Sequence, residues 1–139
     1  MIREWLITNR EVTTAGELRV RGRNYFVYGP ENMIFPPTLP GEETSSFFLV
    51  LEGFVLPRRE FENRFPDLSQ EELIHELYRE HGPDFIRFVK GNFIIFAGEP
   101  KNGFSLFTDR LGIKKVFYYH DPASGDFFLS NRFGAIAAV

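Results

Sequence analysis

Cysteine is absent from this chain of 139 residues. Its absence excludes disulfide cross-links, thiolate metal sites and thiol nucleophiles, because each of these needs the sulfur atom of a cysteine. The composition is compatible with a reducing compartment.

Long apolar segments and a strong net charge of either sign are absent as well. Residues 1–10 do not have the apolar run and small-residue cleavage site of a secretory signal, and no stretch is long enough to span a membrane. The formal net charge of -3 gives no overall attraction to nucleic acid or to an anionic membrane. We therefore expect a cytoplasmic protein without a membrane partner.

One short segment is basic, although the chain as a whole is acidic. Arg19, Arg21 and Arg23 alternate along a predicted strand, close to Tyr25 and Tyr28. Such a basic and aromatic face could bind single-stranded nucleic acid. We favour a solvated strand face, because the chain as a whole is acidic.

Aromatic and aliphatic residues are abundant. The chain has 17 phenylalanines, 43% hydrophobic residues and 25% charged residues, a composition typical of globular rather than disordered proteins. Its length suits one domain with a substantial core. We expect a single folded unit over residues 1–139.

The clearest helix signal lies in the middle of the chain. Ser69 and Glu72 have the S-x-x-E spacing of a capping box, in which each side chain caps the backbone N–H of the other residue, and Gly82 is placed to end the helix. A second, shorter helix is predicted over residues 84–90. Residues 58–65 can form another short helix.

Strands are predicted on both sides of this helix. The nearly continuous apolar run at residues 46–55 predicts a central strand covered on both faces, whereas the prolines between residues 30 and 41 indicate a loop. Further strands are expected at residues 17–28, 92–97, 104–108, 115–120 and 126–130. Tight turns between them imply antiparallel pairing, and the segregated helices favour the α+β class.

The second half of the chain has an ordered series of motifs. After the glycine that ends the helix come Asp84-Phe85 and a Gly-x-Phe strand, and then Asp109-Arg110-x-Gly112-x-Lys114 with two tyrosines at positions 118 and 119. In order and spacing this series resembles the class II glutamine amidotransferase domain at the front of asparagine synthetases. The similarity covers about half of the chain well, is weaker upstream of that half, and is only vague before Phe47.

The resemblance implies a fold and a chemistry. The fold would be that of an N-terminal-nucleophile hydrolase, a four-layer α-β-β-α sandwich of two antiparallel sheets. In that family the domain hydrolyses glutamine with a cysteine exposed as the first residue, whose thiolate attacks the amide while its own α-amine serves as the base.

The residues at the family's functional positions differ in this chain. Ile2 stands at the position of the nucleophile and Glu52 at that of the asparagine that donates to the oxyanion, while Phe54 and Gln70 replace two acidic residues that hold the substrate amino group. Gly53 is retained, and a tight strand end where only glycine fits explains it at least as well as a binding role. We expect a degenerate pocket with no catalytic residue, no cofactor and no metal.

The signature residues Asp109, Arg110, Gly112 and Lys114 are retained. For the Asp-Arg pair we favour a structural role in bracing a turn through charge-assisted hydrogen bonds, with ligand binding as the alternative. The two helical histidines, His75 and His81, are six positions apart and so lie on different helix faces, unlike the pair of a zinc helix.

Three functional hypotheses follow. The first is a catalytically inactive amidotransferase-like domain that serves an asparagine-synthetase-like, ATP-dependent amide-forming enzyme as a partner or regulatory domain. Its ATP-pyrophosphatase-type domain would be a separate protein, or the chain would be part of a longer synthetase. The second is an amidohydrolase with an unrecognised base or with Thr13 or Thr14 exposed by cleavage as the nucleophile. The third is a small-molecule binding module, and the oligomeric state stays open.

Overall fold

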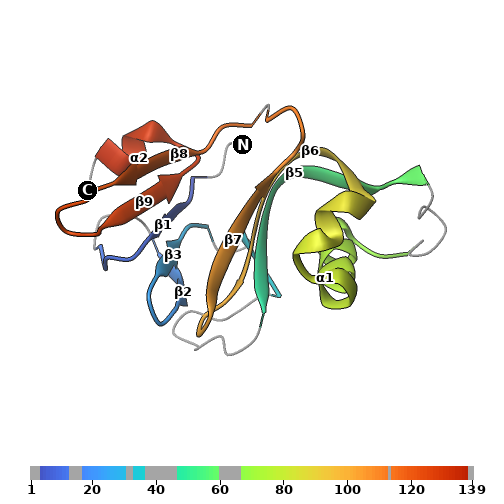
Figure 1. Cartoon of the computed structure of the whole chain (residues 1–139), viewed down its shortest axis with the longest axis horizontal. Coiled ribbons are helices and arrows are strands. Elements are labelled where there is room, and N and C mark those ends of the chain that lie inside the picture. Colours follow the sequence, from blue (N-terminus) through green and yellow to red (C-terminus); the bar gives the residue numbers. More distant parts are fainter. Residues whose placement is uncertain are drawn as a thin grey trace.

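A computed structural model describes residues 4–12, 17–30, 33–36, 47–59, 67–112 and 114–137. The fold is mixed α+β, with two antiparallel sheets and few helices (Figure 1). The α+β class and the antiparallel pairing expected from the sequence are thereby confirmed. No helix in the described part of the chain is long and apolar enough to cross a membrane. The cytoplasmic location stays a prediction.

The first sheet has five strands and joins the beginning of the chain to its end. Its strand order is β2-β3-β1-β9-β8. The strands are β1 (Leu6–Thr8), β2 (Leu18–Arg21), β3 (Phe26–Tyr28), β8 (Phe117–His120) and β9 (Phe127–Ser130). Because β1 pairs with β3 on one side and with β9 on the other, the two ends of the sequence meet in this sheet (Figure 1).

The second sheet has four strands in the order β4-β5-β6-β7. They are β4 (Ile34–Phe35), β5 (Phe48–Pro57), β6 (Val89–Glu99) and β7 (Gly103–Thr108). The long central pair, β5 and β6, is in continuous register from Phe48↔Gly98 to Pro57↔Val89. This pair provides the rigid platform on which the remaining elements pack.

Helix α1 (Gln70–His81) covers one face of the second sheet and begins where the capping box predicts. The Ser69 hydroxyl accepts a hydrogen bond from the Glu72 N–H, and the Glu72 carboxylate accepts one from the Ser69 N–H. Gly82, with a φ of 61°, ends the helix. The predicted helix boundaries are confirmed.

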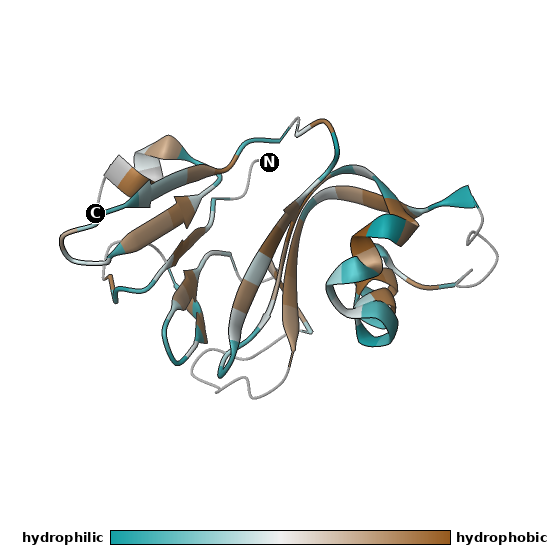
Figure 2. Cartoon of the chain, in the orientation of Figure 1, coloured by the Kyte–Doolittle hydropathy of each residue, from teal (hydrophilic) through white to brown (hydrophobic). Residues whose placement is uncertain are grey.

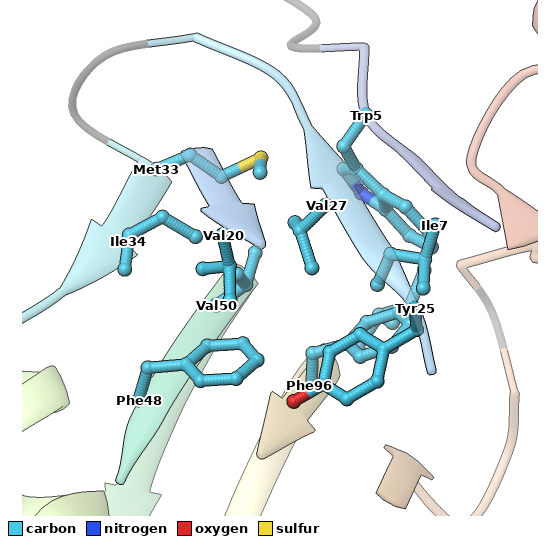
Figure 3. Close-up of a cluster of buried hydrophobic side chains, with 11 residues drawn as sticks. Trp5, Ile7, Val20, Tyr25, Val27, Met33, Ile34, Phe48, Val50 and Phe96 are labelled. Carbon is cyan, nitrogen blue, oxygen red and sulfur yellow. The ribbon is translucent and has the colours of Figure 1, made fainter. Parts of the chain in front are cut away.

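Three apolar clusters occupy the spaces between successive layers. The largest lies between the two sheets and combines Ile7, Val27 and Trp5 of the N-terminal region with Phe48 and Phe96 of the second sheet (Figure 3). A second fills the space between the second sheet and α1, where Leu73, Ile74 and Leu77 are buried. The third lies on the outer face of the first sheet, where Leu6, Tyr28 and Phe128 pack with Ile136 of the short helix α2 (Phe133–Ala137). In Figure 2 the apolar colour follows the strands and the sheet-facing side of α1.

Several expectations are corrected by the structure. The second predicted helix is a 3-10 segment, η3 (Gly82–Phe88), and it ends early because β6 already begins at Val89. Strand β5 is covered on both faces only in its first half, since Phe54 and Leu56 are each 49% exposed. Strands β1 and β4 were missed because each is too short to show an alternation of its own. Most of residues 58–65 lies outside the described residues.

Candidate functional site

A cleft of about 530 Å³ opens where the core between the two sheets ends. Trp5, Met33 and Val50 belong both to this core and to the wall of the cleft. Polar residues complete the lining: Glu52 and Gly53 from β5, Gln70 and Glu71 from the start of α1, Lys114 and Lys115 before β8, and Asn131 after β9. The cleft therefore combines an apolar base with a polar wall that carries both signs of charge.

A chain of hydrogen bonds links the two sheets at this cleft. The side-chain amide of Asn131 donates to the Glu52 carboxylate over 2.6 Å, and the Asn131 side-chain oxygen accepts from the backbone N–H of Trp5 over 3.0 Å. Asn131 directly follows β9 and Glu52 lies on β5, so the contact joins segments 79 positions apart in the sequence. Glu52 is held in place by a partner that sequence reasoning did not identify.

Gly53 has a steric reason to be glycine. Its φ is 100°, a region that L side chains rarely adopt, and a Cβ atom there would lie 2.1 Å from the backbone oxygen of Asn92. The same Cβ would lie 2.7 Å from Cε of Lys114, so the lysine side chain crosses directly over this glycine. Only glycine is accommodated here, as expected, but Gly53 lies in the middle of β5 and not at a strand end, and its conformation lets Lys114 reach the cleft.

Gln70 fixes the first residue of α1 to the edge of β5. Its side-chain oxygen accepts a hydrogen bond from the Val55 N–H over 2.6 Å. Because an antiparallel strand directs alternate N–H groups to opposite edges, this N–H would otherwise lack a partner from β6. At the position where the resemblance implies a substrate-binding acid, the side chain thus satisfies the backbone.

The described residues along the cleft present carboxylate, amide and ammonium groups beside apolar side chains. Among the described lining residues there is no serine, threonine or cysteine. The indole N–H of Trp5 is buried and has no hydrogen-bond acceptor among the described residues, although Trp5 is only 3% exposed. A buried N–H without an acceptor is unfavourable by about 1–3 kcal/mol.

The Asp109 carboxylate organises the turn that follows β7. One oxygen accepts from the Phe93 N–H, and the other accepts from the N–H groups of Leu111 and Gly112. Burial of Asp109 acts to raise the pKa of its carboxyl group, but these backbone donors outweigh it and hold that pKa below its ordinary value. The geometry is that of the turn-bracing role expected for Asp109, whereas Arg110 is exposed.

The structure brings together four of the sequence-predicted positions and leaves others apart. Glu52, Gly53, Gln70 and Lys114 line the same cleft. Phe54 is not among its described lining residues, because it lies two positions further along β5, where the side chain is half exposed. Ile2, Thr13 and Thr14 lie outside the described residues.

Among the members of the site that sequence reasoning missed, two come from distant parts of the chain. Trp5 and Asn131 come from the two ends of the chain and reach the cleft only because β1 and β9 are neighbours in the first sheet. The only tryptophan of the chain was a usable signal, since a large ring with one polar atom often lies at the boundary between a core and a binding site.

The basic strand face does not form. A register irregularity in β2 buries Arg19, whose guanidinium donates to the Gly29 carbonyl and pairs with Glu17. Arg21 pairs with Glu11 over 2.9 Å. These carboxylates neutralise the face that nucleic acid would need.

The histidines have aromatic neighbours. His75 lies against the rings of Phe35 and Phe47, and His81 stacks on Phe88 with ring centroids 4.2 Å apart. No cluster of three or more potential metal ligands occurs within the described residues.

Comparison with known proteins gives no match: no protein-family model fits the chain, and no curated protein sequence is significantly similar to it.

Proposed function

We propose that this chain is a catalytically inactive class II glutamine amidotransferase-like domain. It would serve as a partner or regulatory domain for an asparagine-synthetase-like, ATP-dependent amide-forming enzyme. The observation that carries the proposal is the convergence of Glu52, Gly53, Gln70 and Lys114, positions that the resemblance relates to a substrate pocket and its signature, on one cleft. Residues 52 and 114 are far apart in the sequence, so a chance similarity of motifs would not require them to meet.

The arrangement of layers supports the same family of folds. Apolar clusters lie between α1 and the second sheet, between the two sheets, and between the first sheet and α2. We propose that this order corresponds to the four-layer α-β-β-α sandwich of the N-terminal-nucleophile hydrolases. The antiparallel pairing in both sheets agrees with it.

The proposed loss of catalysis rests on the chemistry of the cleft. Glutamine hydrolysis by the family's route needs a thiolate, and this chain has no cysteine. It also needs a hydrogen-bond donor for the oxyanion, a contribution on the order of 3 kcal/mol. Glu52 offers a carboxylate at the matching position, and a carboxylate repels a developing oxyanion. The hydrogen bond from Asn131 holds that carboxylate in the wall of the cleft.

A direct experiment separates an inactive domain from an enzyme. Purified protein is incubated with glutamine, and released ammonia is measured beside a mock purification. We expect no ammonia above the mock. Ammonia release that disappears on a substitution within this chain would overturn the proposed inactivity. The intact mass of the same sample tests the amidohydrolase alternative, because a chain processed to begin at Thr13 or Thr14 is lighter by the removed segment.

The partner role needs its own experiment. The tagged chain is used to recover proteins from extract of its native source, and the recovered fraction is assayed for ATP-dependent amide formation with release of pyrophosphate. We expect this activity to co-purify with the chain and not with the tag alone. Repeated recovery without any ATP-dependent ligase would contradict the partner role.

Binding of a small molecule in the cleft is a second candidate function. It is favoured by the lining of the cleft, which places the charged residues Lys114 and Glu71 beside Trp5, whose indole N–H has no acceptor among the described residues. Thermal-shift screening with amino acids and nucleotides tests it, since a ligand that binds only the folded state raises the melting temperature. A hit should be lost in Lys114→Ala and kept in Lys101→Ala, a variant of an exposed lysine in the β6–β7 turn.

A further inference from the structure

Strand β6 has an edge that β7 covers only in part. β7 pairs with residues Ile94 to Glu99 of β6, whereas β5 pairs with residues Val89 to Gly98 of β6. The pairing of β7 with β6 ends at Ile94, because the chain leaves the sheet at Asp109, directly after β7. Among the described residues, no strand pairs with the first part of β6 on this side.

The backbone groups of this edge point away from β5. At Phe93 the carbonyl accepts from the Asp109 N–H and the N–H donates to the Asp109 carboxylate, so both groups of Phe93 face the β7 side. In an antiparallel sheet, residues two positions apart direct their backbone groups to the same edge. Gly91 therefore directs its N–H and C=O groups to the edge that no described strand covers, whereas Val89 is only 3% exposed at the end of η3.

A groove of about 640 Å³ lies along this edge. Its apolar base is formed by Ile86, Val89 and Phe93, and the turn after β7 forms one wall. Leu111 in that wall is 79% exposed, the largest exposure among the large hydrophobic residues described. The groove thus offers apolar contacts beside a strand edge that no described strand covers, the combination that extended peptides use when they add to a sheet.

Among the described residues that line the groove, the exposed charges are all positive. Arg58, Lys90 and Arg110 line it, and all three residues are exposed. Asp109 is the only acidic residue among the described lining residues, and its carboxylate already accepts three backbone hydrogen bonds. A partner that is complementary to this groove carries negative charge.

We propose that the groove binds an extended, acidic segment of a partner protein, which pairs with the edge of β6 at Gly91. Acidic side chains at alternate positions of the segment face the three cations, and apolar side chains between them contact the base and Leu111. A peptide fits better than a nucleic acid. The edge offers peptide donors and acceptors, and the one aromatic residue in the lining, Phe93, is buried and cannot stack with a base. The groove and its charges do not depend on the amidotransferase resemblance.

A displayed library of random peptides of about nine residues, selected on the full chain, tests this inference. We expect enriched peptides to carry Asp or Glu at alternate positions. The most enriched peptide, synthesised with a fluorophore, should protect the amide hydrogen of Gly91 from exchange when it binds. Selection without acidic enrichment, or binding that leaves this amide unprotected, would overturn the proposal.

Charge-reversal variants locate the site. Lys90→Glu and Arg110→Glu should each weaken binding of that peptide on the order of tenfold, because each replaces an attraction by a repulsion. Lys101→Glu is the matched control in the distant β6–β7 turn and should bind as tightly as the unchanged chain. Both groove variants alter exposed side chains, and circular dichroism verifies that they fold. Equal binding by all variants, or full competition by single-stranded DNA of mixed sequence, counts against a peptide site.

Discussion

The side-chain amide of Asn131 donates a hydrogen bond of 2.6 Å to the carboxylate of Glu52 and thereby joins the end of β9 to the middle of β5. The same asparagine accepts a hydrogen bond from the Trp5 backbone, so it holds one strand of the second sheet and both terminal segments of the chain together. Asn131 lies in the wall of the cleft, so the residue that links the two sheets also forms part of the site.

Removing this contact should reduce stability. Asn131→Ala is expected to lower the free energy of unfolding by about 1–2 kcal/mol, because it leaves a partly buried carboxylate and a backbone N–H without their partner. Asn131→Asp should lower it further, since a second negative charge would face Glu52. Urea unfolding measures both variants, with exposed Asn24→Ala as the control. If the free energy of unfolding falls no further than in the control, the Asn131 side chain does not stabilise the contact between the two sheets.

Gly53 should not tolerate any side chain. Gly53→Ala is expected to lose more than about 2 kcal/mol of stability, because a Cβ there meets both the Asn92 backbone and the Lys114 side chain in addition to the strain of a φ of 100°. Gly112→Ala is the matched control: its φ of 59° is also positive, but nothing lies within 4 Å of the added Cβ. The control should lose about 1–2 kcal/mol from conformational strain alone. Equal losses in thermal or urea unfolding would show that steric contact at Gly53 is unimportant.

Asp109 should stabilise the fold in a pH-dependent manner. Its folded-state pKa is held below the ordinary value, so its contribution is present above the unfolded pKa and is lost as the pH falls through the folded pKa. Asp109→Asn should be less stable at pH 7, because one amide oxygen cannot accept the hydrogen bonds that two carboxylate oxygens accept.

Unfolding curves of the two proteins from pH 7 to pH 2 check this expectation. The stability difference between them should shrink below about pH 4, where the unfolded carboxyl begins to bind a proton. The exposed Asp67→Asn serves as the control. A difference that stays constant over this range would contradict the role of the ionised carboxylate.

Tyr25 should make the fold sensitive to high pH. Its ring is buried and its hydroxyl donates to the Glu99 carbonyl over 2.9 Å. Burial, with a smaller effect of the Glu99 charge, raises the pKa of Tyr25 well above its ordinary value. The neutral phenol is therefore favoured by folding, and its contribution is full below the unfolded pKa of about 10 and is lost as the pH rises beyond it.

Tyr25→Phe removes the ionisable group and keeps the ring. It should lose about 1 kcal/mol at pH 7 through the missing hydrogen bond, and its stability should fall less steeply above pH 10 than that of the unchanged chain. Tyr118→Phe, in which an exposed ring is changed, should follow the unchanged chain over the whole range. Parallel pH profiles for Tyr25→Phe and the unchanged chain would exclude this linkage.

Features defined by neighbouring residues were available from the sequence alone. The capping box of Ser69 and Glu72, the glycine that ends α1 and the turn between β6 and β7 depend on contacts within a few positions, and all are present in the structure. The strands at β6, β7, β8 and β9 were predicted within a few residues, because each has its own apolar pattern and is bounded by turn residues.

Tertiary structure decided the features that depend on distant partners. Strands β1 and β4 are stabilised by pairing with neighbouring strands rather than by a pattern of their own. The exposure of Phe54 depends on which part of the second sheet is covered by other elements. The composition of the cleft followed the same rule. Sequence motifs indicated Glu52, Gly53, Gln70 and Lys114, whereas Trp5 and Asn131 joined them only because β1 and β9 are hydrogen-bonded neighbours. Propensity and capping act over a few residues, but pairing and burial act between segments that only the folded chain brings together.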